Sequence, residues 1–119
     1  MLGDTMIVSL LKDGRLRADT VAGLVFAPRS NTPEKPVGAM TRKGYLRVCI
    51  NVRGRQHHFM AHRIVWVAAH GPLAAGLQID HGPGGKSDNR LANLEAVTGE
   101  ENMRRAVRDG KFANVGRRD

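Results

Sequence analysis

Residues 77–102 read LQIDHGPGGKSDNRLANLEAVTGEEN, and this stretch decides the fold. Apolar side chains alternate with polar ones at 77–80 and recur at 94–97, which predicts two short strands. The first strand leads into a glycine-rich loop at 82–85. Thr98 has glutamate three positions later, which is the pattern of a helix N-terminus. We therefore expect a strand, a loop, a second strand and a helix.

Four polar residues stand where these elements would meet: Asp80, His81, Asn93 and Asn102. Carboxylate and amide oxygens are ligands for a hard divalent cation, and a neutral imidazole accepts a proton near pH 7. A cation beside a general base is suited to the hydrolysis of phosphodiesters. Each residue alone has an ordinary reading as a turn or capping residue, so the prediction depends on their combination.

The order Asp-His, eleven residues, Asn, eight residues, Asn resembles the motif of the HNH endonucleases, with Asn102 in place of the final histidine. Residues 89–94 (NRLANL) and 97–102 (VTGEEN) resemble phage and homing members. The resemblance is strong over 77–106 and extends more loosely back to 43–48 and 61–66.

The resemblance implies a ββα-metal fold and specific roles. His81 would be the general base, and Asp80 and Asn102 would bind Mg²⁺ or Mn²⁺. Asn93 would hydrogen-bond the loop and hold His81 in orientation. A strand points consecutive side chains to opposite faces, so we expect a sharp turn at Asp80-His81. The family precedent predicts 5′-phosphate and 3′-hydroxyl ends.

The loop is where the chain departs from this family. Relatives usually carry Ile-Asp-Gly-Asn or Ile-Asn-Gly-Asp after the histidine, whereas this chain has Gly82-Pro83-Gly84-Gly85. The spacing is kept but polar side chains are lost. The alternative prediction is therefore a catalytically weak or inactive DNA-binding protein with the HNH fold.

The composition favours one small domain that binds a polyanion. The chain has 119 residues, with 19 Lys and Arg against 11 Asp and Glu, for a net charge of +8. Such a balance favours nucleic acid over an anionic membrane, and no apolar run is long enough to span a bilayer. Cys49 is the single cysteine, and no secretory signal is evident. We expect an intracellular, cytoplasmic protein, bacterial or phage-encoded.

The expected architecture is α+β, a small single domain in which a β-hairpin and a helix precede the C-terminal ββα-metal motif. Residues 1–41 should form an N-terminal helix (5–13, capped by Asp4 or Thr5), a short strand (23–27) and an irregular connection (28–39). Residues 42–110 should form the nuclease domain. It comprises a hairpin (44–61) turning at Arg53-Gly54, a buried helix (62–70) ended by Gly71-Pro72, and the metal-binding core (77–108).

In the last helix, Met103, Ala106 and Val107 should form a buried stripe, with Arg104, Arg105 and Arg108 facing outward. The helix should end at Asp109-Gly110, followed by a basic tail at 111–119.

DNA is the expected partner, and the preferred interpretation is double-stranded DNA. The protein that binds it would be a monomer or a homodimer. Basic side chains of the hairpin, the loop and the last helix are the candidate phosphate contacts. They are Arg42, Lys43, Arg47, Arg53, Arg55, Lys86, Arg90, Arg104, Arg105 and Arg108. The rival from another class is a structural zinc module using His57, His58 or His62.

Overall fold

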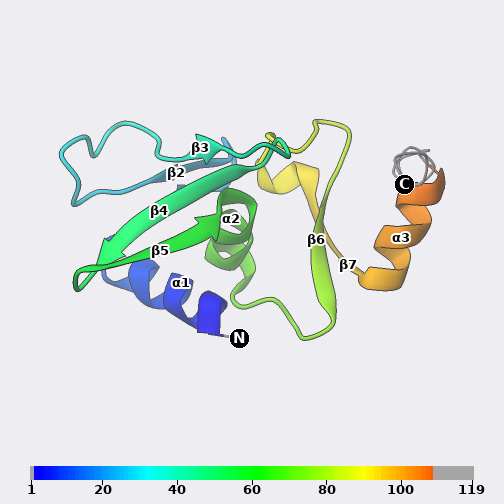
Figure 1. Cartoon of the computed structure of the whole chain (residues 1–119), viewed down its shortest axis with the longest axis horizontal. Helices are drawn as coiled ribbons and strands as arrows, with labels where there is room; N and C mark the ends of the chain where they lie inside the picture. Colours follow the sequence, from blue (N-terminus) through cyan, green and yellow to red (C-terminus); the bar gives the residue numbers. More distant parts are fainter. Residues whose placement is uncertain (1, 109–119) are drawn as a thin grey trace.

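An N-terminal helix, an antiparallel pair of strands and a three-stranded ribbon form one side of the molecule (Figure 1). The computed structural model describes residues 2–108. Helix α1 spans Leu2–Lys12, and strands β1 (Arg17–Asp19) and β2 (Leu24–Phe26) pair antiparallel. Gly14, at φ 78°, follows α1. Strand β1 was not foreseen from the sequence.

A three-stranded ribbon follows, in the order β3-β4-β5. Strand β3 is Ala39–Met40, β4 is Leu46–Val52 and β5 is Arg55–Met60. The turn between β4 and β5 is Arg53-Gly54, and both residues have positive φ, of 53° and 78°. This is the tight turn that the sequence predicts, since two-residue hairpin loops need positive φ at both central positions.

Helix α2 (Ala61–His70) is the centre of the hydrophobic core. Ala61, Ile64, Val65 and Val67 are buried, whereas the last turn of the helix is exposed. Helix α1 packs on α2, as do the β1–β2 hairpin and the β4–β5 ribbon. Gly71, at φ 81°, ends the helix with its amide donating to the carbonyl of Val67.

The metal-motif elements occur in the predicted order. Strand β6 (Leu77–His81) pairs antiparallel with β7 (Leu94–Thr98), a 3-10 turn η1 (Leu91–Asn93) precedes β7, and helix α3 (Gly99–Arg108) follows it. Figure 1 shows α3 at the opposite end of the molecule from α1, against the β6–β7 pair. The hydroxyl of Thr98 accepts a hydrogen bond from the Glu101 amide at 3.0 Å, so Thr98 caps the helix.

Two predictions about the helices are wrong. Asp4 lies within α1 instead of capping it, because its carboxylate is buried against Arg63 of α2. In α3, Met103 and Val107 are 50% and 55% exposed, so they form no buried stripe. Arg105 points inward instead, toward carboxylates on β6 and β7. Charge pairing, not apolar burial, decides which face of α3 meets the strands.

Within residues 2–108, no helix is long and apolar enough to cross a membrane. The predicted helix end at residues 109–110 and the basic tail at 111–119 lie outside the described residues.

Candidate functional site

The four residues that the motif singles out line one cavity. Asp80, His81, Asn93 and Asn102 all border a hollow of about 1030 Å³ between the β6–β7 pair, its connecting loop and α3. The rest of the wall includes cationic and aromatic side chains, among them Tyr45, Lys86, Arg105 and Arg108. The cavity therefore joins oxygen ligands, an imidazole and positive charge, which is a composition suited to a phosphate.

Asp80 and His81 leave strand β6 on different sides. The strand continues through both residues, with Asp80 opposite Glu95 and His81 opposite Leu94. The sharp turn that we expected between them is therefore absent, and the chain leaves the strand only after His81. Asp80 reaches α3, while His81 faces the rings of Tyr45 and His62.

Asp80 and Asn102 bring to the cavity the two oxygen donors that the motif predicts. Oδ2 of Asp80 accepts a hydrogen bond from Arg105 at 3.1 Å. The Asn102 amide nitrogen donates to Oε1 of Gln78 at 2.8 Å, which leaves the amide oxygen of Asn102 as the remaining polar atom of that side chain. One carboxylate and one amide oxygen fit Mg²⁺ or Mn²⁺, which take oxygen ligands and keep several waters.

Arg105 is the electrostatic centre of this wall. Its guanidinium contacts Glu95 at 2.9 Å, Glu101 at 3.0 Å and Asp80 at 3.1 Å. The hydrogen bonds that Arg105 donates, the one to Glu95 above all, raise its pKa. Hydrogen bonds from Arg104 and Arg105 lower the pKa of Glu101. The ion pair with Arg105 therefore holds the Asp80 carboxylate in place.

His81 has its hydrogen-bond partner in the loop before η1. Its Nε2 lies 3.0 Å from Oδ1 of Asn89. An amide oxygen can only accept, so Nε2 carries the hydrogen and Nδ1 keeps the lone pair. Asn89 is buried, at 2% exposed. It was not foreseen as a site residue, although its place in the NRLANL segment was a usable signal.

His62 packs edge-on against His81, with ring centroids 4.8 Å apart. Burial, together with the nearby His81 and Arg63, lowers the pKa of His62 to about 4. His62 is therefore neutral at cellular pH. The His62 ring therefore adds no positive charge beside His81.

Asn93 holds the glycine-rich loop closed. Its amide oxygen accepts from the Gly84 amide at 3.0 Å, and its amide nitrogen donates to the carbonyls of Gly85 and Asp88 at 3.3 and 2.9 Å. The Gly82 amide also donates to the Asn93 carbonyl at 2.8 Å. A Cβ at Gly82 would lie 2.9 Å from the Asn93 amide oxygen, so the loop packs too closely for a side chain there. The loop whose sequence differs from that of the family is thus held by hydrogen bonds between its backbone and Asn93.

The candidate DNA-contacting residues fall into two groups. Those of the ribbon are exposed: Arg42, Lys43, Arg47, Arg53 and Arg55. Those of the loop and of α3 make contacts within the protein. Lys86 donates to the Lys43 carbonyl at 3.1 Å, Arg90 pairs with Asp88 at 2.7 Å, and Arg104 pairs with Glu101 at 2.8 Å. Arg108 borders the cavity, at the last described turn of α3.

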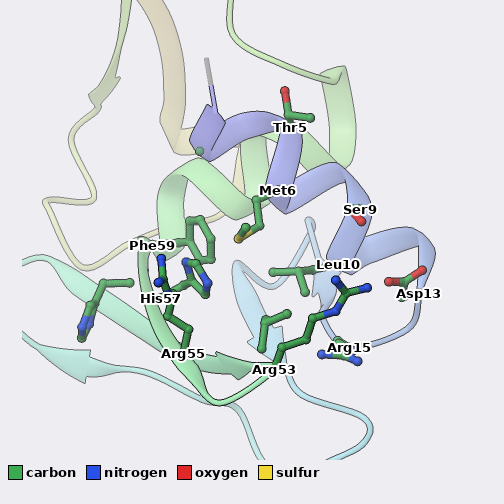
Figure 2. Close-up of a pocket in the computed structure, with 13 residues that line it drawn as sticks. Thr5, Met6, Ser9, Leu10, Asp13, Arg15, Arg53, Arg55, His57 and Phe59 are labelled. Atoms are coloured by element: carbon green, nitrogen blue, oxygen red, sulfur yellow. The ribbon is translucent and has the colours of Figure 1, made fainter.

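A second hollow, of about 950 Å³, lies between α1 and the tip of the ribbon, away from the motif (Figure 2). Met6 and Leu10 of α1 and Phe59 of β5 form its apolar part, and Arg53 and Arg55 stand at its edge. Among residues 2–108, no group of three or more His, Cys, Asp or Glu side chains gathers as a metal site. His58 contacts Cys49, with Nδ1 and Sγ 2.9 Å apart.

Two comparisons with known proteins find a match. Residues 59–104 match the family model described as HNH endonuclease. A solved structure described as "DNA binding and cleavage by the HNH homing endonuclease I-HmuI" is similar, with a TM-score of 0.69 and 25% identity. The match covers 82% of this chain and 55% of that one, so the chain spans little more than half of its neighbour. A search of curated proteins finds no match.

Proposed function

We propose that this chain, whose residues 59–104 match the HNH endonuclease family model, is a divalent-metal-dependent endonuclease that hydrolyses phosphodiester bonds in double-stranded DNA. The proposed products carry 5′-phosphate and 3′-hydroxyl ends. The proposed place of action is the cytoplasm of a bacterial host. One observation carries the proposal: Asp80, His81 and Asn102 border the same cavity, at the spacing of the family motif.

In this mechanism His81 takes the proton of the attacking water. The hydrogen bond from Nε2 to Asn89 leaves Nδ1 as the atom that accepts it. Asn93 keeps the loop after His81 closed, and so limits how far the ring can turn.

Asp80 and Asn102 would hold the divalent cation through their oxygens. Bound there, the cation supplies Lewis-acid stabilisation of the charge that develops on the phosphate and the departing oxygen. Arg105 holds the Asp80 carboxylate in place from the α3 side, and Gln78 turns the Asn102 amide so that its oxygen is the unused atom.

The ribbon would supply the main DNA contact. Five exposed basic residues follow it from Arg42 to Arg55, and none of them has a carboxylate partner among the ion pairs within residues 2–108. Surface cations of this kind release counterions from DNA when they bind its phosphates. The net charge of +8 supports the same partner.

The test is the conversion of supercoiled plasmid by the purified chain with Mg²⁺ or Mn²⁺, and with chelator. We expect nicked or linear product only with the metal, and a rate reduced at least about a hundredfold in Asp80→Ala and His81→Ala. Retained gel shifts in both variants would separate binding from cleavage. Salt-sensitive binding by the wild type without any cleavage would instead indicate the inactive DNA-binding alternative.

A further inference from the structure

Asn89 links the general base to a part of the chain outside the family match. Its side chain is buried, and its amide oxygen receives the hydrogen of His81 Nε2. Its own amide nitrogen is buried and has no hydrogen-bond partner among the described residues. Burying that unpaired donor costs free energy, so other contacts must compensate for keeping Asn89 in this position. Other parts of the structure must hold it.

The turn between β1 and β2 is what meets the backbone around Asn89. The Leu91 amide donates to the Thr20 carbonyl at 2.9 Å. Gly23 is buried at φ 73°, and a Cβ on it would overlap the backbone of Asn89 and Arg90. The two segments therefore touch with no room for a side chain between them.

The turn itself is held internally. The Gly23 amide donates to the Asp19 carbonyl at 2.8 Å, and the Ala22 amide donates to the Asp19 carboxylate at 3.0 Å. Strands β1 and β2 in turn pack on the core helix α2. A continuous set of contacts thus runs from the core, through the hairpin turn, to the residue that orients His81.

We infer that Asn89 is a positioning residue for His81, and that the β1–β2 turn sets its position through the close approach of Gly23. The N-terminal hairpin is then part of the functional site, although it lies outside residues 59–104 that match the family model. The inference rests on the proposed function for its catalytic meaning, but the geometry of His81 can be measured without turnover.

The first test reads the tautomer of His81 directly. Protein labelled with ¹⁵N in histidine is examined by NMR at about pH 8, with the His81 signals assigned from His81→Gln. We expect the Nε2–H tautomer in the wild type and in Asn89→Asp, which keeps an acceptor oxygen. Asn89→Leu has similar volume but no acceptor, and should show a mixture of both tautomers. An unchanged His81 spectrum in Asn89→Leu would overturn the inference.

The second test uses a pair of matched glycines. Gly23→Ala and Gly14→Ala place alanine at nearly the same positive φ, 73° and 78°, but only Gly23 has backbone within reach of the new methyl group. Both should lose stability through strain. Only Gly23→Ala should shift the His81 signals and lower kcat for plasmid nicking, by about tenfold, with KM little changed. Equal effects of the two substitutions would contradict the role of the turn.

The outcomes separate this inference from the nuclease proposal. If the wild type does not cleave DNA while the His81 tautomer still depends on Asn89 and Gly23, the positioning stands and the nuclease proposal fails. If the wild type cleaves DNA while Asn89→Leu keeps both kcat and the His81 spectrum, the positioning fails and the nuclease proposal stands.

Discussion

Nη1 of Arg105 lies 3.1 Å from Oδ2 of Asp80, so the last helix is joined to the first strand of the motif by an ion pair. The same nitrogen lies 2.9 Å from Oε1 of Glu95 on the second strand. No side chain of α3 is buried within the described residues, so its docking depends on these ion pairs and on the hydrogen bond from Asn102 to Gln78. Asn102 is on this helix, so Arg105 contributes to its placement near Asp80.

We predict that Arg105→Ala loosens α3. Hydrogen exchange of the amides at 101–108 should become about fivefold faster, which corresponds to a decrease of about 1 kcal/mol in the stability of the docked helix. Arg104→Ala is the matched control, because Arg104 is 63% exposed and pairs with carboxylates of its own helix. Equal exchange rates in the two variants would mean that Arg105 does not dock the helix.

A second prediction concerns the amide of Asn102. Asn102→Ala should abolish metal-dependent nicking, because it removes a ligand oxygen, whereas Gln78→Ala should lower it by about 10- to 100-fold, because it frees the amide to rotate. Raising the Mn²⁺ concentration should restore much of the activity of Gln78→Ala and little of that of Asn102→Ala. Titrations of nicking rate against Mn²⁺ measure both. A fully active Asn102→Ala would remove this residue from the metal site.

The ribbon can be tested through salt dependence. Replacing Arg47 and Arg53 by Ala should weaken binding to any duplex and reduce the slope of log K against log salt by about 0.9 for each phosphate that the variant no longer neutralises. Arg29→Ala, an exposed arginine outside the ribbon, is the control. Fluorescence anisotropy with a labelled duplex, in Ca²⁺ to prevent cleavage, gives the slopes. If the double variant and the control have the same slope, the ribbon does not contact DNA.

The Asp4–Arg63 pair should stabilise the fold. Arg63 donates to both carboxylate oxygens of Asp4, at 2.6 and 3.0 Å, and the Leu73 amide donates at 2.9 Å. Burial would raise the pKa of Asp4, but these hydrogen bonds outweigh it and lower the pKa below 3.8. Asp4→Ala should cost about 3 kcal/mol in urea unfolding at pH 7, since it leaves a guanidinium without its partner. Asp13→Ala, at an exposed site, should cost under about 0.5 kcal/mol.

The buried His62 predicts how the stability of the fold changes with pH. Its pKa is lowered from 6.5 to about 4 in the folded state, so the unfolded chain binds the proton more readily between these values. Stability should therefore fall as the pH drops from about 6.5 toward 4, by about 2 to 3 kcal/mol from this residue. His62→Phe should flatten that part of the profile, while His70→Gln, at an exposed site, should not. Urea unfolding at about pH 7.5 and 4.5 measures the difference, and identical slopes for wild type and His62→Phe would contradict the burial of a neutral ring.

Local signals in the sequence were enough for most elements. The Arg53-Gly54 turn, the end of α2 at Gly71 and the cap at Thr98 each follow from backbone chemistry that is confined to a few residues. The apolar pattern predicted the wrong face for α3, because periodicity cannot show that Arg105 meets carboxylates on other elements. The same limit applies to Asp4, which reads as a cap until Arg63, far along the chain, is placed beside it.

The candidate site shows the same division. Motif spacing identified Asp80, His81, Asn93 and Asn102, and all four border one cavity. The residues that orient them were not found from the sequence: Gln78 for Asn102, and Asn89 for His81. Gly23 could not be found either, because its importance comes from a close backbone approach between segments that are far apart in the sequence.

The most direct test of the central claim is to locate the cation. Mn²⁺ is titrated into ¹⁵N-labelled protein, and paramagnetic broadening of the NMR signals is mapped. We predict that the side-chain amide of Asn102 and the backbone amides of Asp80 and His81 broaden first, and that Asp80→Ala abolishes this effect. Broadening centred elsewhere, such as on His57 and His58, or unaffected by Asp80→Ala, would contradict the account.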